Sequence, residues 1–530
     1  MILKDKHSQE GVKPEKRACG ILLHLTSLPG RHGCGDLGPG ADVFIDFLSR
    51  AGQRFWQILP INPTSAYFDN SPYMSFSSMA GNPLLISPEI LVTQGLLTPG
   101  DLRGVDFSDY LVEFNRVIPY RRALLERACA AFLAAGGRTE LERQSRELDW
   151  IEDYALFMAL KERHQDKPWY AWPAPLARRD PAALAAEQRD LAPRLDYFRF
   201  EQAMFFRQWR DFRLRLARRG IELIGDLPIY VGQDSVDVWA YQDIFQLDRR
   251  SRRPTVVAGV PPDYFSATGQ RWGNPLYRWH QGGAAVEKAL LDWWTRRFAA
   301  AFALVDLVRV DHFRAFAAYW AIPERETTAV RGKWCPGPGE PFFQQLTNRL
   351  GHLPLIIEDL GLITPDVERL RDGLGLPGMK VLQFAFDGDP DNTHLPHNFR
   401  TPDCVVYTGT HDNETTLGWH LNPQVSEAAK QQLRDYANRH PGDPGQAHEH
   451  LIHLALGSTA RLAILPMQDL LGFGNDCRMN TPSTPQGNWR WRCHGRYFSP
   501  ELADSLARRC RLFGRAFHPA DETMTPGAKP

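Results

Sequence analysis

Short apolar runs, each bounded by turn residues, recur along the chain in the way expected of strands in a buried parallel sheet. Eight of them begin near residues 20, 55, 222, 304, 355, 380, 405 and 462. Segments with helical periodicity lie between most of these runs, for example at 40–50, 286–302 and 364–372. Alternating strands and helices predict an α/β fold with a parallel sheet, and eight such units close into a (β/α)8 TIM barrel. An open, doubly wound sheet is the alternative, but no GxGxxG turn follows any of these strands.

One gap between the predicted strands is far longer than a simple connection. The second strand ends near residue 59 and the third begins near residue 222, and the sequence between them is strongly helical. We therefore expect a mostly helical insertion at about 84–193 on a loop of the C-terminal face, where barrels carry substrate-binding additions. Too few residues follow the eighth strand for a C-terminal β-sandwich. The expected organisation is a frayed tail at 1–18, a single catalytic barrel at 19–516 with substrate loops at 64–82 and 259–280, and a disordered tail at 517–530.

Charge and composition exclude several classes of protein. The 530 residues include 62 Lys and Arg against 62 Asp and Glu, so the chain lacks the basic excess that nucleic-acid binding needs. The N-terminus has no apolar segment of a signal peptide, and no run of about 18 apolar residues could span a membrane. The eight cysteines are scattered without CxxC pairs or metal-ligand spacing, as is typical of reduced thiols. We expect a cytoplasmic metabolic enzyme with no metal, cofactor, nucleic-acid partner or membrane anchor.

Acidic residues stand at or just after the C-terminal ends of five predicted strands. They are Asp226, Asp311, Glu358 with Asp359, Asp387 and Asp412. A barrel brings these strand ends together at one mouth, which is where barrel enzymes hold their active site. Any one of these acids could be a turn or helix-capping residue. Acidic residues at the equivalent ends of five strands together favour a catalytic site.

Two of these acids are predicted to differ in protonation. Arg309 and Asp311 are two residues apart on a strand, so both face the barrel axis, and the guanidinium lowers the pKa of the carboxyl group. Glu358 follows the apolar run 355–357, whose surroundings raise the pKa of a carboxyl group. One ionised and one protonated acid is the arrangement of a retaining glycosidase. The alternative is a structural ion pair of Arg309 with Asp311 and a capping role for Glu358.

Two loops combine flat rings with amides and glycines and show neither helical nor strand periodicity. They lie at 67–76 and 263–275. Sugar rings have apolar faces and a rim of hydroxyls, so aromatic platforms flanked by Asn, Gln and Asp suit them. Loops packed by their own rings are the alternative. His411 beside Asp412 could be a metal ligand, but no second strand-end histidine completes a ligand set, and we do not expect metal catalysis.

Six segments of the chain carry a family resemblance. They are 71–77 (SPYMSFS), 225–230 (GDLPIY), 265–275 (FSATGQRWGNP), 309–314 (RVDHFR), 357–361 (IEDLG) and 410–413 (THDN). In content and order they resemble the 4-α-glucanotransferases, or amylomaltases, of glycoside hydrolase family 77, and the resemblance extends from about residue 20 to residue 492. The chain departs from the family pattern at Met74, where Gln is common, and at 480–484 (NTPST).

The resemblance implies an activity and a role for each matching residue. The activity is transfer of a segment of an α-1,4-glucan or maltooligosaccharide to the 4-hydroxyl of another glucan or glucose, by a retaining double displacement. The implied catalytic residues are Asp311 as nucleophile, Glu358 as general acid/base and Asp412 as transition-state stabiliser, with Arg309 and His411 beside them. The implied substrate-binding residues are Ser71, Tyr73, Asp226, Tyr264, Phe265, Gln270, Trp272, Asn274, Asp387 and Asn480. A hydrolase using the same acids and a non-catalytic glucan-binding barrel are the alternatives.

Overall fold

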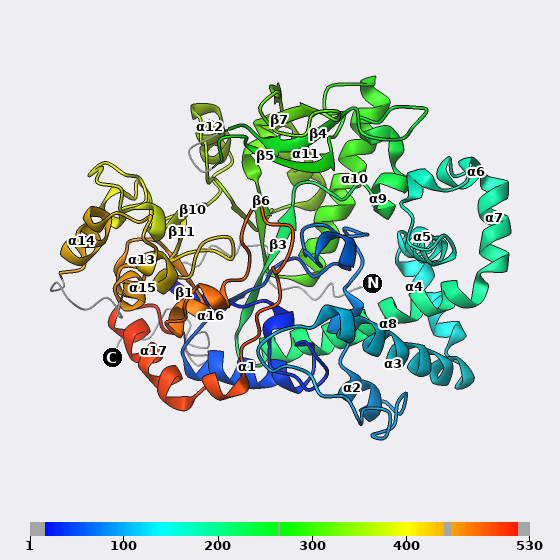
Figure 1. Ribbon diagram of the computed structural model, residues 1–530, viewed down its shortest axis with the longest axis horizontal. Coiled ribbons are helices and arrows are strands. Elements are labelled where there is room, and N and C mark those ends of the chain that lie inside the picture. The colour runs from blue at the N-terminus through cyan, green and yellow to red at the C-terminus, as the bar shows by residue number, and fades with distance from the viewer. Residues whose placement is uncertain (1–15, 263–265, 439–446, 518–530) are drawn as a thin grey trace.

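The computed structural model describes residues 16–262, 266–438 and 447–517. At its centre, eight parallel strands form a sheet in the order β10-β11-β12-β1-β2-β3-β6-β9 (Figure 1). They are β1 (Ala18–Leu22), β2 (Phe55–Gln57), β3 (Glu222–Pro228), β6 (Leu307–Asp311), β9 (Leu355–Ile357), β10 (Gly378–Val381), β11 (Cys404–Tyr407) and β12 (Leu462–Pro466). The two ends of the sheet meet where the Ile357 N–H donates to the Pro377 carbonyl at 3.0 Å. Each strand overlaps a predicted apolar run, and the predicted (β/α)8 barrel is confirmed.

Helices surround the barrel because each buries one apolar stripe against the strands. In α1 (Pro39–Arg50), Pro39 takes the first helical turn, where its missing N–H removes no hydrogen bond, and Phe44, Phe47 and Leu48 are buried. The other helices that alternate with the strands are α10 (Gly283–Leu304), α11 (Gly339–Leu350), α12 (Pro365–Gly373), α13 (Thr416–Leu421), α14 (Glu427–Tyr436), α15 (Ala447–Gly457), α16 (Met467–Leu470) and α17 (Pro500–Leu512).

The stretch between β2 and β3 is helical, as predicted. It contains α2 (Pro88–Thr93), α3 (Phe114–Ala134), α4 (Arg138–Glu147), α5 (Ile151–Arg163), α6 (Ala174–Ala177), α7 (Pro181–Asp190) and α8 (Ala192–Ala217), and it projects to one side of the barrel in Figure 1. The ion pair of the buried Lys161 with the partly exposed Asp234, 2.7 Å, joins α5 to the loop that follows β3. The helical layer is therefore tied directly to the rim of the barrel.

A second sheet lies on the connections that follow β3 and β6, and the sequence did not predict it. Its antiparallel strands are ordered β5-β4-β7-β8 and comprise β4 (Val256–Val260), β5 (Gln270–Pro275), β7 (Ala318–Pro323) and β8 (Lys333–Pro336). The expectation that 263–275 is entirely irregular was therefore wrong for β5. The strand conformation of β5 is imposed by its pairing with β4, which includes a register shift between Val257 and Gly259. The sequence of β5 shows no hydrophobic alternation from which a strand could be predicted. The short α9 (Val236–Ala240) precedes this sheet.

Much of the aromatic content serves the core. Trp56, Trp169, Trp239, Trp293 and Trp294 are fully buried, and Trp56 packs edge-on against Phe44 and Phe212 between the barrel and its helices. The predicted tails at 1–18 and 517–530 lie almost wholly outside the described residues, and Ala18 already belongs to β1. Within the described ranges, no helix combines the length and apolarity needed to cross a membrane.

Candidate active site

Three strand ends place an arginine among three carboxylates at the mouth of the barrel. Arg309 and Asp311 lie on β6, and Arg309 is paired in register with Asp226 on β3. Glu358 directly follows β9, and its backbone N–H donates to the Val310 carbonyl of β6 at 3.1 Å. Alternate residues of a strand share a face. Arg309, Asp311 and Asp226 therefore all point to the barrel axis, as predicted for the first two.

One guanidinium joins all three acids. Nη1 of Arg309 lies 2.7 Å from Oδ2 of Asp226 and 3.2 Å from Oδ1 of Asp311, and Nη2 lies 3.1 Å from Oε2 of Glu358. The side chains of Asp226 and Arg309 are 0% and 2% exposed, whereas those of Asp311 and Glu358 are 25% and 19% exposed. Asp226 is thus sealed behind Arg309, and the other two acids open to the mouth.

The protonation of the two open acids is the reverse of the expectation from the sequence. Burial and the neighbouring Glu358 carboxylate raise the pKa of Asp311 well above its usual range. Although burial raises the pKa of Glu358, Arg309, the hydrogen bond with Asp311 and the backbone N–H of His312, 2.7 Å away, together lower it. The expectation was wrong because Arg309 serves both acids, not Asp311 alone. The two carboxyl groups share a hydrogen bond and therefore titrate as a pair.

A second chain of contacts leads from Asp226 to Asp412. The Tyr73 hydroxyl donates to Oδ2 of Asp226 at 2.7 Å, and its oxygen lies 2.8 Å from Nε2 of His411. Because the Tyr73 hydrogen is given to Asp226, the His411 nitrogen carries the proton of this second bond. The same Nε2 is 3.3 Å from Oδ2 of Asp412, whose Oδ1 accepts from Nδ2 of Asn480 at 2.6 Å. Asp412 is therefore held from both sides while its carboxylate stays 43% exposed.

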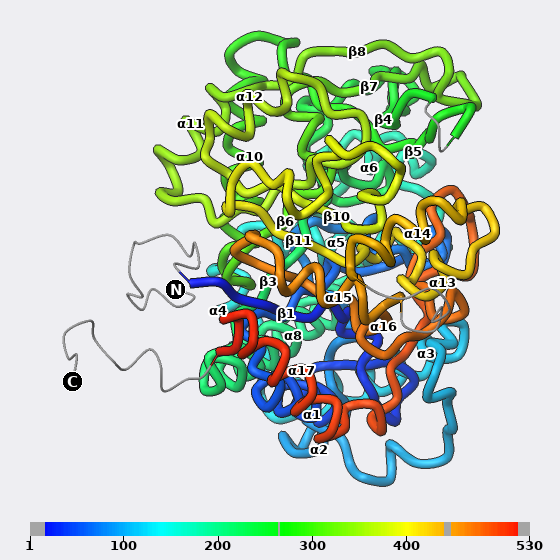
Figure 2. Tube along the Cα trace, turned by 90° about the vertical axis from the view of Figure 1, so that its left-hand side faces the viewer, coloured from blue at the N-terminus to red at the C-terminus, as the bar shows by residue number. Residues whose placement is uncertain are grey.

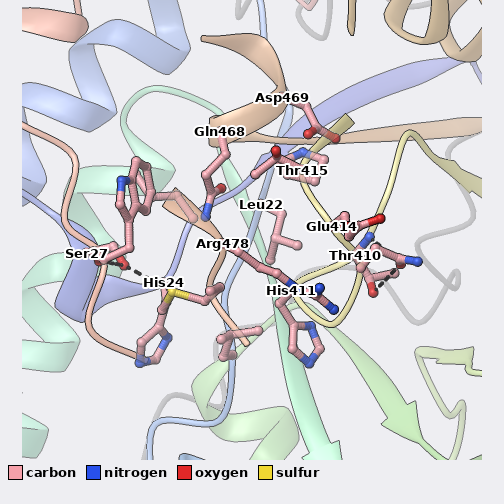
Figure 3. Close-up of a pocket in the computed structure, with 16 residues that line it drawn as sticks. Leu22, His24, Ser27, Thr410, His411, Glu414, Thr415, Gln468, Asp469 and Arg478 are labelled. Atoms are coloured by element: carbon pink, nitrogen blue, oxygen red, sulfur yellow. Dashed lines mark hydrogen bonds between the residues drawn. The ribbon is translucent and has the colours of Figure 1, made fainter. Parts of the chain in front are cut away.

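A small cavity of about 30 Å³, lined by both polar and apolar side chains, lies behind this chain of contacts (Figure 3). Its lining includes His24, His411 and Arg478, and in Figure 3 the Arg478 side chain extends toward His411. Arg478 donates to the backbone carbonyls of Asp412 and Asn480 at 2.6 and 2.7 Å. Burial and the neighbouring His411 lower the pKa of His24 to about 3, so its ring is neutral at physiological pH. Arg478 thus fixes the backbone that carries Asp412.

An aromatic platform stands on the other side of the acids. Trp272 of β5 meets the His312 ring edge-on with centroids 4.7 Å apart, and its indole N–H donates to Oε1 of Gln270 at 3.2 Å. His312 has a φ of 50°, a left-handed conformation that is uncommon for residues other than glycine, and this conformation accompanies the bond from its backbone N–H to Glu358. The predicted residues Tyr264 and Phe265 lie outside the described residues.

Three predicted substrate residues make other contacts. Asn274 is buried, and its amide donates to the Val231 carbonyl and to the Met74 sulfur. The Ser71 hydroxyl accepts from the Tyr73 N–H at 3.3 Å, which shapes the turn that carries Tyr73. Asp387 is exposed and accepts from Asn392 within its own loop. No contact among the described residues joins any of these three to Asp311, Glu358 or Asp412.

The sequence left three residues of the site without a role. Arg478 and His312 support Asp412 and Glu358 as described above, and the Trp489 ring lies 5.6 Å from Tyr73 and 6.0 Å from His411. Trp489 has a φ of 63°, a strained value for so bulky a side chain. The mixture of amides and rings at 488–491 (NWRW) resembles that of the other two loops and could have drawn attention to it. Among the described residues, no group of three or more His, Cys, Asp or Glu is arranged to hold a metal ion.

Comparisons with known proteins agree on one group. The family model described as 4-alpha-glucanotransferase, of glycoside hydrolase family 77, matches residues 23–498. The 4-alpha-glucanotransferase of Synechocystis sp. is 46% identical over 514 residues, 96% of this chain and 100% of that one. The enzyme of the same name from Thermus thermophilus is 46% identical over 92% of this chain and 96% of its own. An amylomaltase from Streptococcus agalactiae, solved in complex with acarbose, has a TM-score of 0.90 at 38% identity, covering 94% of this chain and all of the other.

Proposed function

Because the chain belongs to the 4-α-glucanotransferases of glycoside hydrolase family 77, we propose that Asp311, Glu358 and Asp412 carry out glucan transfer at the mouth described above. The enzyme moves a segment of an α-1,4-glucan to another glucan. The observation that carries the assignment of residues is the single Arg309 guanidinium shared by Asp226, Asp311 and Glu358. It keeps two catalytic carboxyl groups close together with one proton between them.

In the first displacement, Asp311 is the nucleophile. Its carboxylate attacks the anomeric carbon while Glu358 protonates the departing glycosidic oxygen, which gives a covalent glycosyl-enzyme. The proton shared by the pair moves to Glu358 when that oxygen binds against it, and this leaves Asp311 ionised and facing the sugar. Arg309 then stabilises the Asp311 carboxylate before attack and the Glu358 carboxylate after proton donation.

In the second displacement, Glu358 acts as a base on the 4-hydroxyl of an incoming glucan. The oxygen of that hydroxyl attacks the anomeric carbon, the bond to Asp311 breaks, and the α-1,4 linkage re-forms with retention. Asp412 hydrogen-bonds sugar hydroxyls more strongly in the distorted, positively charged transition state than in the ground state. Asn480 and His411 hold the Asp412 carboxylate in position for this task.

The acceptor glucan stacks beside Glu358 on the platform made by Trp272 and His312. Ser71, Tyr264, Phe265, Gln270, Asn274 and Asp387 complete the proposed contacts of the donor and acceptor chains. Excluding water from this platform favours transfer over hydrolysis. We place the enzyme in the cytoplasm, in keeping with eight scattered cysteines whose spacing shows no disulfide framework.

Incubation with maltotriose tests the proposal. A ladder of longer maltooligosaccharides together with glucose is the expected result of transfer. Maltose and glucose alone would indicate hydrolysis with the same acids, and unchanged maltotriose would indicate a glucan-binding barrel without catalysis. Mass spectrometry of the Glu358→Gln variant with an activated glycosyl fluoride should trap the sugar on Asp311, because the first step then needs no acid.

A further inference from the structure

Two thiols meet at the base of the barrel, at the end opposite the mouth. Cys19 lies in β1, Cys510 lies in α17, and 491 positions separate them along the chain. Their sulfur atoms are 3.2 Å apart, and neither side chain is exposed to solvent. Figure 2 shows α17 running along the flank of the barrel on the side where β1 begins. The fold therefore brings the first strand and the last helix together at this pair.

The surroundings of the pair favour a negative charge on sulfur. Arg515 is 1% exposed, and its side chain donates to the carbonyls of Ala18, Leu456, Ser458, Ala460 and Arg461. Among the described residues, no carboxylate lies within ion-pair distance of this guanidinium. Neutral carbonyls solvate the cation but do not balance its charge.

Cys510 is the thiol better placed to be ionised. Gln53 donates from Nε2 to the Cys510 sulfur at 3.4 Å. The hydrogen bond with Cys19, the Gln53 amide and the Arg515 charge lower the pKa of Cys510 despite its burial, whereas the same bond and burial raise that of Cys19. The lowered pKa favours Cys510 as the attacking thiol and Cys19 as the resolving one.

We propose that Cys19 and Cys510 form a peroxide-sensitive dithiol whose disulfide joins β1 to α17. The Cys510 thiolate attacks one oxygen of hydrogen peroxide, the O–O bond breaks, and sulfenic acid and hydroxide result. The Cys19 sulfur then attacks the sulfenic sulfur, the S–S bond forms, and the sulfenic oxygen leaves as water with the Cys19 proton. The hydroxide takes up the proton released when Cys510 ionised. Two thiols and one peroxide thus give one disulfide and two waters.

Little movement is needed for this bond. A disulfide sulfur pair is about 2.05 Å apart, so the two sulfurs need to approach by only about 1 Å. Hydrogen peroxide reaches the two thiols through the end of α17. There Leu512 is 73% exposed, and opening of the terminal helical turn costs little free energy. The bond closes a loop of nearly the whole chain and therefore restricts the unfolded state strongly. Since the pair lies at the base, the mouth of the barrel is unaffected.

The experiment uses the full chain, reduced and then treated with hydrogen peroxide. Peptide mapping without reductant should find Cys19 linked to Cys510, and the free thiols counted after unfolding should fall from eight to six. The apparent Tm should rise by about 2 to 5 °C and return to its original value with dithiothreitol. The initial rate of maltotriose transfer should be the same in both forms.

Cys510→Ser and, independently, Cys19→Ala should abolish both the link and the rise in Tm. The matched control is Cys129→Ser, which alters another buried cysteine, in α3, and should leave both responses intact. Eight intact thiols after treatment, sulfinic acid at Cys510 without a link, or the same rise in Tm in both pair variants would each overturn the proposal. If one pair variant fails to fold, the other decides the outcome by the same two measurements.

Discussion

Nη1 of Arg309 lies 2.7 Å from Oδ2 of Asp226, a carboxylate with no exposure to solvent. This pair sits directly beneath the two open acids, and its charges help to set their protonation. Asp226 raises the pKa of Asp311, after the larger effects of burial, Glu358 and Arg309. A residue on the neighbouring strand thus contributes to the pKa of Asp311, and a pH profile can reveal that contribution.

Asp226→Asn should shift the alkaline limb of the pH profile of kcat/KM to lower pH. The enzyme is active while the Asp311–Glu358 pair holds one proton, so activity falls as pH rises through the upper pKa of the pair. Removing the Asp226 charge lowers that pKa, because one source of negative potential is lost and Arg309 is freed for the pair. Profiles of the variant and of the exposed control Asp389→Asn should be measured together. An alkaline limb that does not move would contradict this role.

Asp311→Asn should reduce maltotriose transfer by about 10³-fold or more, because an amide cannot form the glycosyl-enzyme. The variant should keep its fold, since Asp311 is 25% exposed and the change affects only its contacts with Arg309 and Glu358. Initial rates and circular dichroism check both statements, with Asp391→Asn on an exposed loop as the control. Turnover within tenfold of the parent would rule out the proposed nucleophile.

Asn480→Ala should lower kcat about 10- to 100-fold with a smaller change in KM. Its amide hydrogen-bonds Oδ1 of Asp412 at 2.6 Å, so its loss frees the carboxylate to rotate away from the position where the transition state needs it. Asn348→Ala, on the exposed face of α11, is the matched control. If KM alone rises, Asn480 binds glucan directly and does not act through Asp412.

Trp272→Ala should raise the ratio of hydrolysis to transfer by about tenfold. The indole packs on His312, whose N–H holds Glu358, so removing it opens the acceptor platform to water beside the general base. Trp272→Phe keeps a flat ring and should retain most of the transfer. Free glucose and total reducing ends measured from maltotriose give the ratio. Equal ratios in the parent and the Ala variant would remove Trp272 from the acceptor side.

Glu201 should make the stability of the protein depend on pH. It is buried in α8, where its Oε1 accepts from the Tyr197 hydroxyl at 2.7 Å, and burial raises its pKa to about 7. The unfolded chain loses this proton near its ordinary value, so stability is full below about pH 4.5 and declines until about pH 7, by about 3 kcal/mol.

Glu201→Gln should remove this decline and unfold at a higher temperature than the parent at pH 8. Gln still accepts the Tyr197 hydrogen bond, so the change removes charge with little change in packing. Thermal unfolding at pH 5.5 and pH 8 should be compared with Glu142→Gln, an exposed neighbour in α4. The prediction fails if the difference between the two pH values is the same in Glu201→Gln and in the parent.

The sequence alone determined the barrel and which acids stand at the ends of its strands. Buried parallel strands must be apolar on both faces, so all eight were visible as short apolar runs, and the acids at their ends were visible as exceptions to that rule. The order of the six family segments could likewise be read directly from the sequence. None of this required knowing which residues touch.

Only the tertiary structure decided how those acids share charge. The sequence placed Arg309 beside Asp311 because they are two residues apart, but the register of β3 and β9 with β6 brings Asp226 and Glu358 to the same guanidinium. Burial of Asp311 beside Glu358, and the contact of Glu358 with Arg309, reverse the pKa directions expected from the sequence. The β5 strand and the Cys19–Cys510 contact likewise depend on partners far away in the chain. Pairing, burial and charge sharing are properties of neighbours in space, and hydrophobic periodicity records only neighbours along the chain.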